Sequence, residues 1–210
     1  MNISFYADPY LYDWKIEKGE KIGIISYKSL FLANEIEVNE KLNLQLRKFG
    51  LSPKTFFIST LKDHIIQKKL IDIFKKLEND KKTRVIILSG SGKGFSAGHN
   101  LKEVKNLKVR SKYLKLFNLC SKLMMKIVEG KKPVIAKVHG AAYAAGCQLA
   151  ASCDLAYSTT NATFATPGVN IGLFCSTPMV AVSRKVSRKI MMKMLLTGKP
   201  KNAKQPKENG

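Results

Sequence analysis

This 210-residue chain lacks the sequence features that mark membrane-spanning and triphosphate-binding proteins. A membrane-spanning helix needs roughly 18 or more uninterrupted apolar residues, and the longest apolar stretches are cut by Lys137, Asp154 and Pro178. The motif G-x-x-x-x-G-K-[ST] is also absent, and with it the phosphate-binding loop of many nucleotide hydrolases. We therefore expect neither a membrane span nor a triphosphate site.

Cysteine and histidine are too sparse and too dispersed to predict a disulfide framework or a metal centre. The four cysteines have no C-x-x-C spacing and lie among apolar or small residues, at Cys120, Cys147, Cys153 and Cys175. This pattern is typical of buried free thiols in a reducing compartment. The three histidines are far apart in the sequence, at His64, His99 and His139. A zinc site needs clustered ligands, so we expect no bound metal.

Acidic residues are scarce relative to basic ones. The chain has 15 Asp and Glu against 37 Lys and Arg, which gives a net charge of +22 and a pI near 9.9. The first fifty residues are neutral, so the whole excess follows Leu51. Such charge attracts polyanions: nucleic acid, anionic lipid or the phosphates of coenzyme A. Solvated lysines on helix faces, as in K-K-L-I-D-I-F-K-K-L, are the alternative explanation, and composition leaves both open.

Alternating apolar strands and amphipathic helices predict an α/β layered fold. Short apolar runs predict strands at Arg84–Ser89, Val134–Val138 and Leu155–Ser158, with a further candidate strand in K-I-G-I-I-S-Y-K. Apolar residues at helical spacing predict helices at Leu61–Glu78, Ser111–Val128 and Arg188–Thr197. Thr60 and Asp63 have capping-box spacing ahead of the first helix. On the second helix the expected core stripe is Tyr113, Phe117, Cys120, Met124 and Ile127, with Met125 as a further core filler.

Two strand-to-loop units carry the chemistry. Lys132–Gly172 reads as a strand, a tight glycine turn, a helix of small residues, a second strand and a Pro-Gly loop. Val85–Val104 begins in the same way, with a strand that runs into G-S-G-K-G-F-S-A-G-H-N-L-K-E-V. The small residues Ala97 and Gly98 would let a ligand approach the backbone closely. Two such corners can aim two backbone N–H groups at one oxygen atom, the geometry that stabilises an enolate next to a thioester.

The motifs F-S-A-G-H-N-L-K-E and G-A-A-Y-A-A-G-C-Q-L-A-A-S-C-D-L resemble those of the crotonase (enoyl-CoA hydratase/isomerase) superfamily. The run F-A-T-P-G-V-N-I-G-L-F-C-S-T-P is most similar to its enoyl-CoA hydratase domain-containing protein 3 branch. The resemblance covers roughly Leu51 to Pro200. It implies a crotonase-like spiral of ββα units, an acyl-CoA thioester as ligand, no separate cofactor, and a homotrimer or hexamer. It also implies a mitochondrial location, with a cytoplasmic one as the alternative because no arginine-rich presequence is evident.

The same resemblance divides the chain into three parts. Residues 1–50 are a poorly defined N-terminal segment, and residues 51–198 are the acyl-CoA-binding domain. Residues 199–210 are a basic tail with almost no large apolar side chains, which predicts disorder. Crotonase-like chains continue for several more helices, so we expect a truncated form in which the C-terminal helical cap is missing.

By match to the family motifs, the backbone N–H groups of His99 and Ala145 form an oxyanion hole. Each such donor contributes on the order of 3–4 kcal/mol of transition-state stabilisation. Ala145 would open the Ala-rich helix, where unpaired donors and the helix dipole favour negative charge. Tight helix packing explains the small residues equally well, and the two explanations are compatible. The match gives no role to the side chain of His99, and a general base is the alternative interpretation of that side chain.

The sequence departs from the family at the two glutamates that share alkene hydration. They align with Gln148 and Gly168. Glutamine can hold a water molecule but cannot take its proton, and glycine has no side chain. Loss of one general acid or base costs roughly 10²–10⁴-fold in rate, so we expect negligible hydratase turnover. Asp154 matches a structural aspartate that caps a turn, and Asn170 is the nearest polar side chain that could substitute.

Lysines at the pocket rim would bind the phosphates of coenzyme A. Lys102 matches a position that is often basic in the family, and Lys54 lies near the expected adenine end. Either could instead be a solvated surface lysine.

Three functions stay open at this point. The first is an acyl-CoA-binding protein of fatty acid or lipid metabolism with weak or altered activity. The second is a non-catalytic acyl-CoA sensor or assembly partner. The third is RNA binding, which the basic charge favours; the lack of aromatic residues among the basic runs argues against it.

Overall fold

The computed structural model describes residues 4–5, 21–27, 54–57, 64–81, 83–90 and 93–203, and gives only the backbone of residues 4–5, 21–27, 54–57 and 64–66. The predicted start of the first helix at Leu61 and its capping pair, Thr60 and Asp63, lie outside the described residues. None of the helices within these ranges is both long enough and apolar enough to cross a bilayer.

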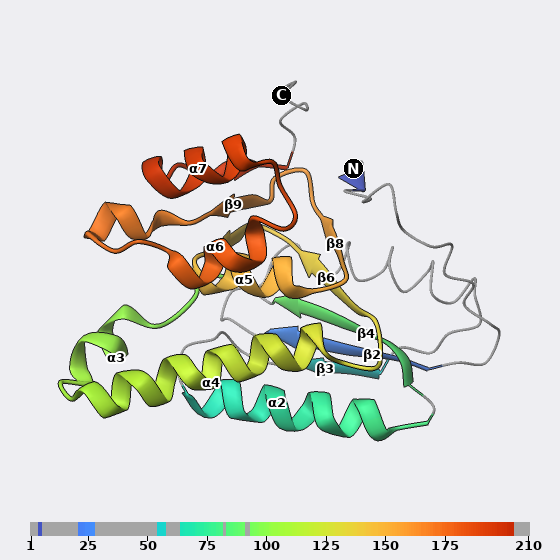
Figure 1. Ribbon diagram of the computed structural model, residues 1–210. Helices are drawn as coiled ribbons and strands as arrows, with labels where there is room; N and C mark the ends of the chain where they lie inside the picture. The colour runs from blue at the N-terminus through green and yellow to red at the C-terminus, as the bar shows by residue number, and fades with distance from the viewer. Residues whose placement is uncertain are drawn as a thin grey trace.

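The larger sheet has six strands in the order β1-β8-β6-β4-β2-β3 (Figure 1). Their bounds are Ser4–Phe5 (β1), Lys21–Tyr27 (β2), Lys54–Phe57 (β3), Thr83–Gly90 (β4), Val134–Val138 (β6) and Leu155–Ser158 (β8). All neighbours run parallel except β1, which is antiparallel to β8. The strands expected at β4, β6 and β8 are confirmed. The candidate strand in the first fifty residues is β2, which pairs with β4 in the same sheet.

The smaller sheet has four strands in the order β10-β9-β7-β5. Their bounds are Gly94–Ser96 (β5), Ala141–Tyr143 (β7), Thr163–Ala165 (β9) and Lys201–Asn202 (β10). Strands of two or three residues are too short to show periodicity, so the sequence did not predict this sheet. β10 also corrects the expected tail: Lys201 pairs with Phe164, and Ala203 is buried. Order therefore extends past Gly198, and residues 204–210 lie outside the described part.

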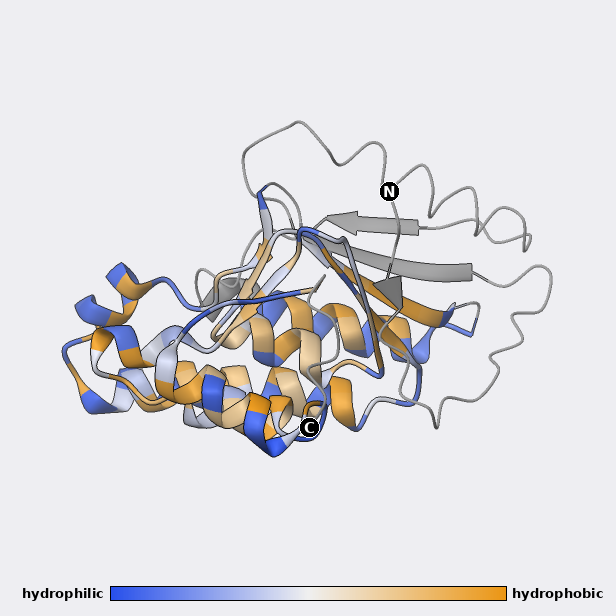
Figure 2. Ribbon diagram, turned by 90° about the horizontal axis from the view of Figure 1, so that it is seen from above, coloured by the Kyte–Doolittle hydropathy of each residue, from blue (hydrophilic) through white to orange (hydrophobic). Residues whose placement is uncertain are grey.

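Six α-helices and one 3₁₀ helix surround the sheets in the described part of the chain. Their bounds are His64–Asn79 (α2), Leu101–Asn106 (α3), Arg110–Val128 (α4), Ala145–Ser152 (α5), Pro167–Ile171 (η1), Ser176–Val182 (α6) and Arg188–Thr197 (α7). α2 and α4 lie side by side against one face of the larger sheet (Figure 1). Helices on that side are banded with hydrophobic and hydrophilic residues, as their amphipathic pattern predicts (Figure 2).

The core consists of two clusters. The larger one joins α2, α4 and α5 to the sheets, and its most deeply buried side chains are Leu70, Leu88, Phe95, Leu123 and Leu149. The smaller one joins α5 to α6 and α7 through Cys147, Val182, Met191, Met194 and Leu195. α5 contributes residues to both clusters, and its many small residues allow this close packing.

The predicted core stripe of α4 is partly wrong. Cys120, Met124 and Ile127 are buried as expected, but Phe117 is 43% exposed and Met125 is 47% exposed. Leu116 and Leu123 are buried in their place, so the buried face is rotated relative to the prediction.

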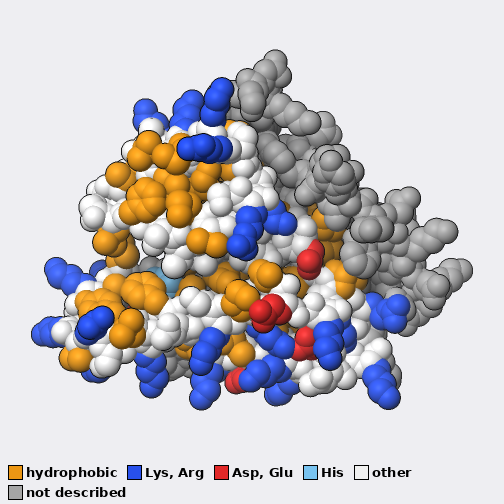
Figure 3. All heavy atoms as spheres, in the orientation of Figure 1, with side chains coloured by type: hydrophobic (Ala, Val, Ile, Leu, Met, Phe, Trp, Pro, Cys, Tyr) orange, Lys and Arg blue, Asp and Glu red, His pale blue; other side chains and the backbone are white. Residues whose placement is uncertain are grey.

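Charge and exposed apolar side chains are unevenly distributed over the surface. The face in Figure 3 carries many Lys and Arg side chains and few Asp and Glu. Exposed hydrophobic side chains gather over α6 and α7, and again over α3 and the N-terminal end of α4. They include Leu101, Leu114, Leu173, Phe174 and Leu196.

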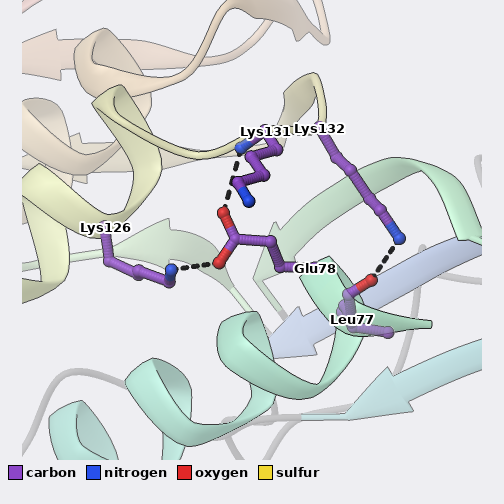
Figure 4. A network of polar contacts seen from close by, with 5 residues as sticks. All are labelled: Leu77, Glu78, Lys126, Lys131 and Lys132. Atoms are coloured by element: carbon purple, nitrogen blue, oxygen red, sulfur yellow. Dashed lines mark hydrogen bonds and ion pairs between the residues drawn. The ribbon is translucent and has the colours of Figure 1, made fainter.

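A polar network around Glu78 fixes the C-terminal end of α2 (Figure 4). Oε2 of Glu78 pairs with the ammonium of Lys126 on α4, and Oε1 accepts a hydrogen bond of 3.1 Å from the backbone N–H of Lys131. Lys132 donates to the Leu77 carbonyl oxygen at 2.5 Å. The hydrogen bond from Lys126, followed by that from Lys131, lowers the pKa of Glu78.

Asp154 has the structural role expected of it. Its Oδ2 accepts a hydrogen bond of 2.7 Å from the N–H of Val134, and its own N–H donates to the Val134 carbonyl oxygen at 2.9 Å. This reciprocal pair ties the turn after α5 to the start of β6.

Candidate functional site

Three strand ends bring the predicted site residues to one edge of the smaller sheet. β5, β7 and β9 are parallel neighbours, so their carboxyl ends lie at the same edge. The chain leaves β5 into the segment that holds His99, leaves β7 into α5 at Ala145, and leaves β9 into η1 at Gly168. The fold therefore collects the three corners that the sequence singled out.

The first two corners are in direct contact. Gly98 has φ +89°, and a Cβ added there would lie 3.0 Å from the backbone nitrogen of Ala145 and 3.2 Å from the Cβ of Ala144. Only glycine fits this position, because other residues disfavour the backbone angle and would crowd α5. The N–H of Gly98 donates to Oγ of Ser96 at 3.2 Å, which holds the loop against the helix start.

The backbone conformation of Ala144 sets the direction of the first backbone N–H of α5. It is the N-cap residue and has φ 50° and ψ −121°, a conformation that side-chain-bearing residues rarely adopt. Its N–H donates to the Ala165 carbonyl at 3.0 Å, and its carbonyl accepts from the N–H of Gln148 at 3.0 Å. Alanine gives no sequence signal for a positive φ, so this feature could not be read in advance.

The N–H groups of His99 and Ala145 are both available to a ligand. The first N–H groups of a helix have no acceptor within it. No residue in the described part of the chain accepts a hydrogen bond from either amide. Two unpaired donors thus stand on adjoining corners, where a carbonyl oxygen could bind both.

The side chain of His99 packs against α4. Its ring packs edge-on against Phe117, with 5.5 Å between ring centroids and an interplanar angle of 71°. Nε2 is buried and has no hydrogen-bond partner among the residues that the structure describes. Burial lowers the pKa of His99, so the imidazole is neutral at pH 7.

Gln148 lies one turn into α5 and is only 8% exposed. Its Oε1 is buried, and no residue in the described ranges donates a hydrogen bond to it. α5 has no charged side chain, so the amide of Gln148 is the most polar group that this helix offers.

Gly168 has no room for a side chain. A Cβ added there would lie 2.6 Å from the Leu173 carbonyl oxygen and 2.8 Å from Sγ of Cys175. That sulfur accepts a hydrogen bond of 3.2 Å from the N–H of Gly168. Asn170, the expected substitute, turns elsewhere: its Oδ1 lies against Gly198 at the end of α7.

The remaining predicted positions lie at the rim. Ala97 is exposed and Gly98 is buried, and Lys102 is exposed on α3. The N–H of Lys102 donates to the Asn100 side chain at 3.1 Å, which caps that helix. Lys54 begins β3, where only the backbone is described.

Within the described ranges, neither the cysteines nor a cluster of metal ligands is a candidate for the chemistry of this site. All four cysteines are free, and three are buried as predicted; Cys175 is half-buried. Burial raises the pKa of Cys120 to about 11 and that of Cys147 to about 12. Within residues that the structure describes, no three His, Cys, Asp or Glu side chains come together.

Sequence reasoning missed two polar groups at this edge. The hydroxyl of Ser96 supports the Gly98 loop, and Thr166 after β9 is fully buried with its Oγ1 unpartnered. Serine and threonine are too common in loops for their position to have signalled this.

Comparison with known proteins agrees with this arrangement. The family model for enoyl-CoA hydratase/isomerase matches residues 58–210. Enoyl-CoA hydratase domain-containing protein 3, mitochondrial, of Danio rerio is 54% identical over 126 residues, which is 60% of this chain and 44% of that protein. The human protein of the same name is 52% identical over 122 residues, 58% of this chain and 40% of that protein. The chain thus spans less than half the length of these relatives.

Solved structures give the same result. The crystal structure of human enoyl coenzyme A hydratase domain-containing protein 3 has a TM-score of 0.66 at 47% identity, covering 69% of this chain and 56% of that one. An enoyl-CoA hydratase from Mycobacterium smegmatis has a TM-score of 0.64 at 49% identity, covering 66% and 54%. The expected mitochondrial location agrees with the names of the curated relatives. This chain has the crotonase fold and belongs to the enoyl-CoA hydratase/isomerase family, in which it resembles enoyl-CoA hydratase domain-containing protein 3.

Proposed function

We propose that this chain binds an acyl-CoA thioester whose carbonyl oxygen accepts hydrogen bonds from the backbone N–H groups of His99 and Ala145. The observation that carries the proposal is the contact between Gly98 and the nitrogen of Ala145, which sets two unpaired amides on adjoining corners. Backbone donors held in this way cost no reorganisation when negative charge develops on the oxygen.

The N-terminal end of α5 adds to the attraction. Its first backbone N–H groups point out of the helix, and the partial positive charge at a helix start favours an oxyanion. Lys102, exposed on α3 just past His99, is a candidate for the phosphates of coenzyme A. Lys54 is a further candidate.

Ordinary alkene hydration is not part of the proposal. By resemblance, the two hydratase glutamates fall on Gln148 and Gly168. A glutamine cannot take a proton from water, and the surroundings of Gly168 exclude a side chain. The chain is therefore proposed as an acyl-CoA-binding protein of lipid metabolism that stabilises an enolate without a carboxylate pair. Assembly as a trimer or hexamer stays a prediction from the resemblance.

The test removes one donor without removing the helix. Proline is favoured at the first position of a helix and has no N–H, so Ala145→Pro deletes the proposed hydrogen bond at the start of α5. Ala145→Gly keeps the N–H and serves as the matched control. We expect calorimetric titration with butyryl-CoA to show binding by the wild type and the glycine variant, and binding at least tenfold weaker by the proline variant. Equal affinities in all three would overturn the proposal.

A further inference from the structure

We propose that the imidazole of His99 is the proton acceptor of this site, taking a proton from the carbon next to the thioester carbonyl while the two amides hold the oxygen. This role rests on the proposed function, because it needs the thioester bound at His99 and Ala145. It differs from the role implied by the family motifs, which use only the backbone of this residue.

The first support is the state of Nε2. Buried polar atoms in native proteins nearly always have a hydrogen-bond partner, and an exception calls for an explanation such as a ligand. Nε2 of His99 is buried and has no partner in the described part of the chain, although its ring packs against Phe117. The nitrogen is thus positioned but unoccupied in the protein alone.

The second support is a buried amide on the helix that begins at Ala145, that of Gln148. His99 contacts α4 at Phe117, and Ser152 at the end of α5 donates to Sδ of Met124 at 3.6 Å. α4 therefore contacts both the His99 side chain, through Phe117, and the C-terminal end of α5, through Met124.

Gln148 is four residues before Ser152, so it lies on the same face of α5. Its Oε1 is also buried without a partner. Helical side chains lean towards the N-terminus, which brings the Gln148 amide towards the turn that holds Ala145. Within the described residues, the two corners that carry the amides thus each hold one buried polar atom without a partner, Nε2 of His99 and Oε1 of Gln148.

The third support is that the imidazole of His99 is uncharged at neutral pH. Burial alone lowers the pKa of His99; no charged neighbour contributes. Ionisable side chains on the elements around it are Arg110, Lys112, Tyr113, Lys115, Cys120, Lys122 and Lys126 on α4, Cys147 on α5, and Lys102, Glu103 and Lys105 on α3. The imidazole is consequently uncharged at pH 7, and a neutral imidazole has one nitrogen with a free lone pair that can take a proton.

The step balances without any co-reactant. The bond between C2 and hydrogen breaks, and its electron pair forms the C1=C2 bond of the enolate. The carbonyl π pair moves onto the oxygen, where the two N–H groups stabilise it, and the proton goes to Nε2. Return of a proton that has exchanged with solvent regenerates the thioester. In D₂O the net result is deuterium at C2.

The experiment incubates the chain with butyryl-CoA in D₂O and follows deuterium at C2 by proton NMR. We expect exchange with the wild type, and a loss of roughly 100-fold or more in His99→Gln, which keeps the backbone donor but has no basic nitrogen. His99→Phe, which keeps the ring contact with Phe117, should lose as much. His139→Gln is the matched histidine control and should exchange at the wild-type rate.

A pH profile separates a base from a merely structural residue. Exchange by the wild type should be constant at neutral pH and fall on acidification, with a midpoint below the ordinary value of 6.5 for histidine. Calorimetry with butyryl-CoA is run on every variant. Binding without exchange by the wild type, or equal exchange by His99→Gln, overturns this inference alone, whereas absence of binding by the wild type overturns the proposed function.

Discussion

Gly98 packs directly against the backbone nitrogen of Ala145, and its missing side chain makes this approach possible. A Cβ on Gly98 would lie 3.0 Å from the nitrogen of Ala145, so the missing side chain leaves that N–H uncovered. The two residues are far apart in sequence and sit on different strand ends, yet the parallel pairing of β5 and β7 brings them together.

We expect Gly98→Ala to weaken thioester binding and to destabilise the chain. The new methyl group would crowd Ala144 and Ala145, and the residue would also keep a positive φ, which costs about 1–2 kcal/mol. Urea unfolding measures the stability change, and calorimetry with butyryl-CoA measures binding.

Gly172→Ala is the control for the backbone strain. Gly172 has φ +73°, but a Cβ there would meet nothing within 4 Å. It should lose a similar amount of stability through strain while binding stays unchanged. Equal binding losses in the two variants would mean that strain, and not the contact with α5, sets the affinity.

The elements around the Gly98 contact show which features could be predicted from the sequence and which could not. Regular elements were predictable because their apolar residues follow one period: Val134–Val138, Leu155–Ser158 and Arg188–Thr197 have the predicted bounds. The two corners were found from glycine and small-residue motifs, and their family from the motifs themselves. The positive φ of Ala144 was not, because it depends on hydrogen bonds to Ala165 and Gln148.

Two other predictions were wrong for the same reason, because contacts between distant parts of the chain decided the outcome. Phe117 has the right spacing for the core of α4, but tertiary contacts turn it to the surface, where it meets His99. The short strand β10 was read as tail because lysines and prolines dominate its surroundings. Local composition cannot report a pairing with Phe164 so far back in the chain.

A carboxylate should not be tolerated at position 168. Gly168→Ala is expected to cost about 1–3 kcal/mol by overpacking against Leu173 and Cys175. Cys175→Ala, which removes the sulfur at 2.8 Å, should recover part of that loss in the double variant. Thermal and urea unfolding of the two single variants and the double variant give the coupling energy. Strictly additive effects would show that the sulfur does not limit the space.

The tether at Asp154 should contribute measurable stability. Asp154→Ala removes the acceptor for the Val134 N–H, and a lost hydrogen bond to a charged group costs about 1.5–3 kcal/mol. Asp154→Asn can still present a carbonyl oxygen and should cost less. Urea unfolding at pH 7 distinguishes them; an alanine variant as stable as the wild type would show that the bond is not stabilising.

The ion pair of Glu78 should matter little at pH 7. The pair lies at the surface but is partly covered, with Lys126 26% and Glu78 15% exposed. Surface pairs contribute about 0–1 kcal/mol, so Glu78→Gln should lose about this much stability, and less in 1 M salt. The pKa of Glu78 is lowered, so its contribution is present above the unfolded value of 4.5 and disappears on acidification. Glu129→Gln, at the end of α4, is the control and should show neither effect.

Buried thiols should make the chain sensitive to alkali. Burial raises the pKa of Cys120 to about 11 and that of Cys147 to about 12, while an unfolded thiol has a value of 9.0. The folded form therefore holds these protons more tightly, and stability is complete below pH 9 and declines as the pH rises towards the folded values. Each thiol contributes a slope of about 1.4 kcal/mol per pH unit in that window.

Cys120→Ala tests this assignment. It should lower stability at pH 7 by leaving a cavity, yet show a shallower decline between pH 9 and pH 11 than the wild type. Urea midpoints across that interval are the measurement. An unchanged slope would assign the alkaline sensitivity to other groups.

The crowding at Gly168 also limits which substitutions this position can accept. A point mutation that supplied an acidic side chain there would collide with a backbone carbonyl, which cannot be mutated away, so η1 would have to be rebuilt first. A single substitution at position 168 therefore cannot add a carboxylate at this corner without moving the backbone of η1 or of the loop that follows it.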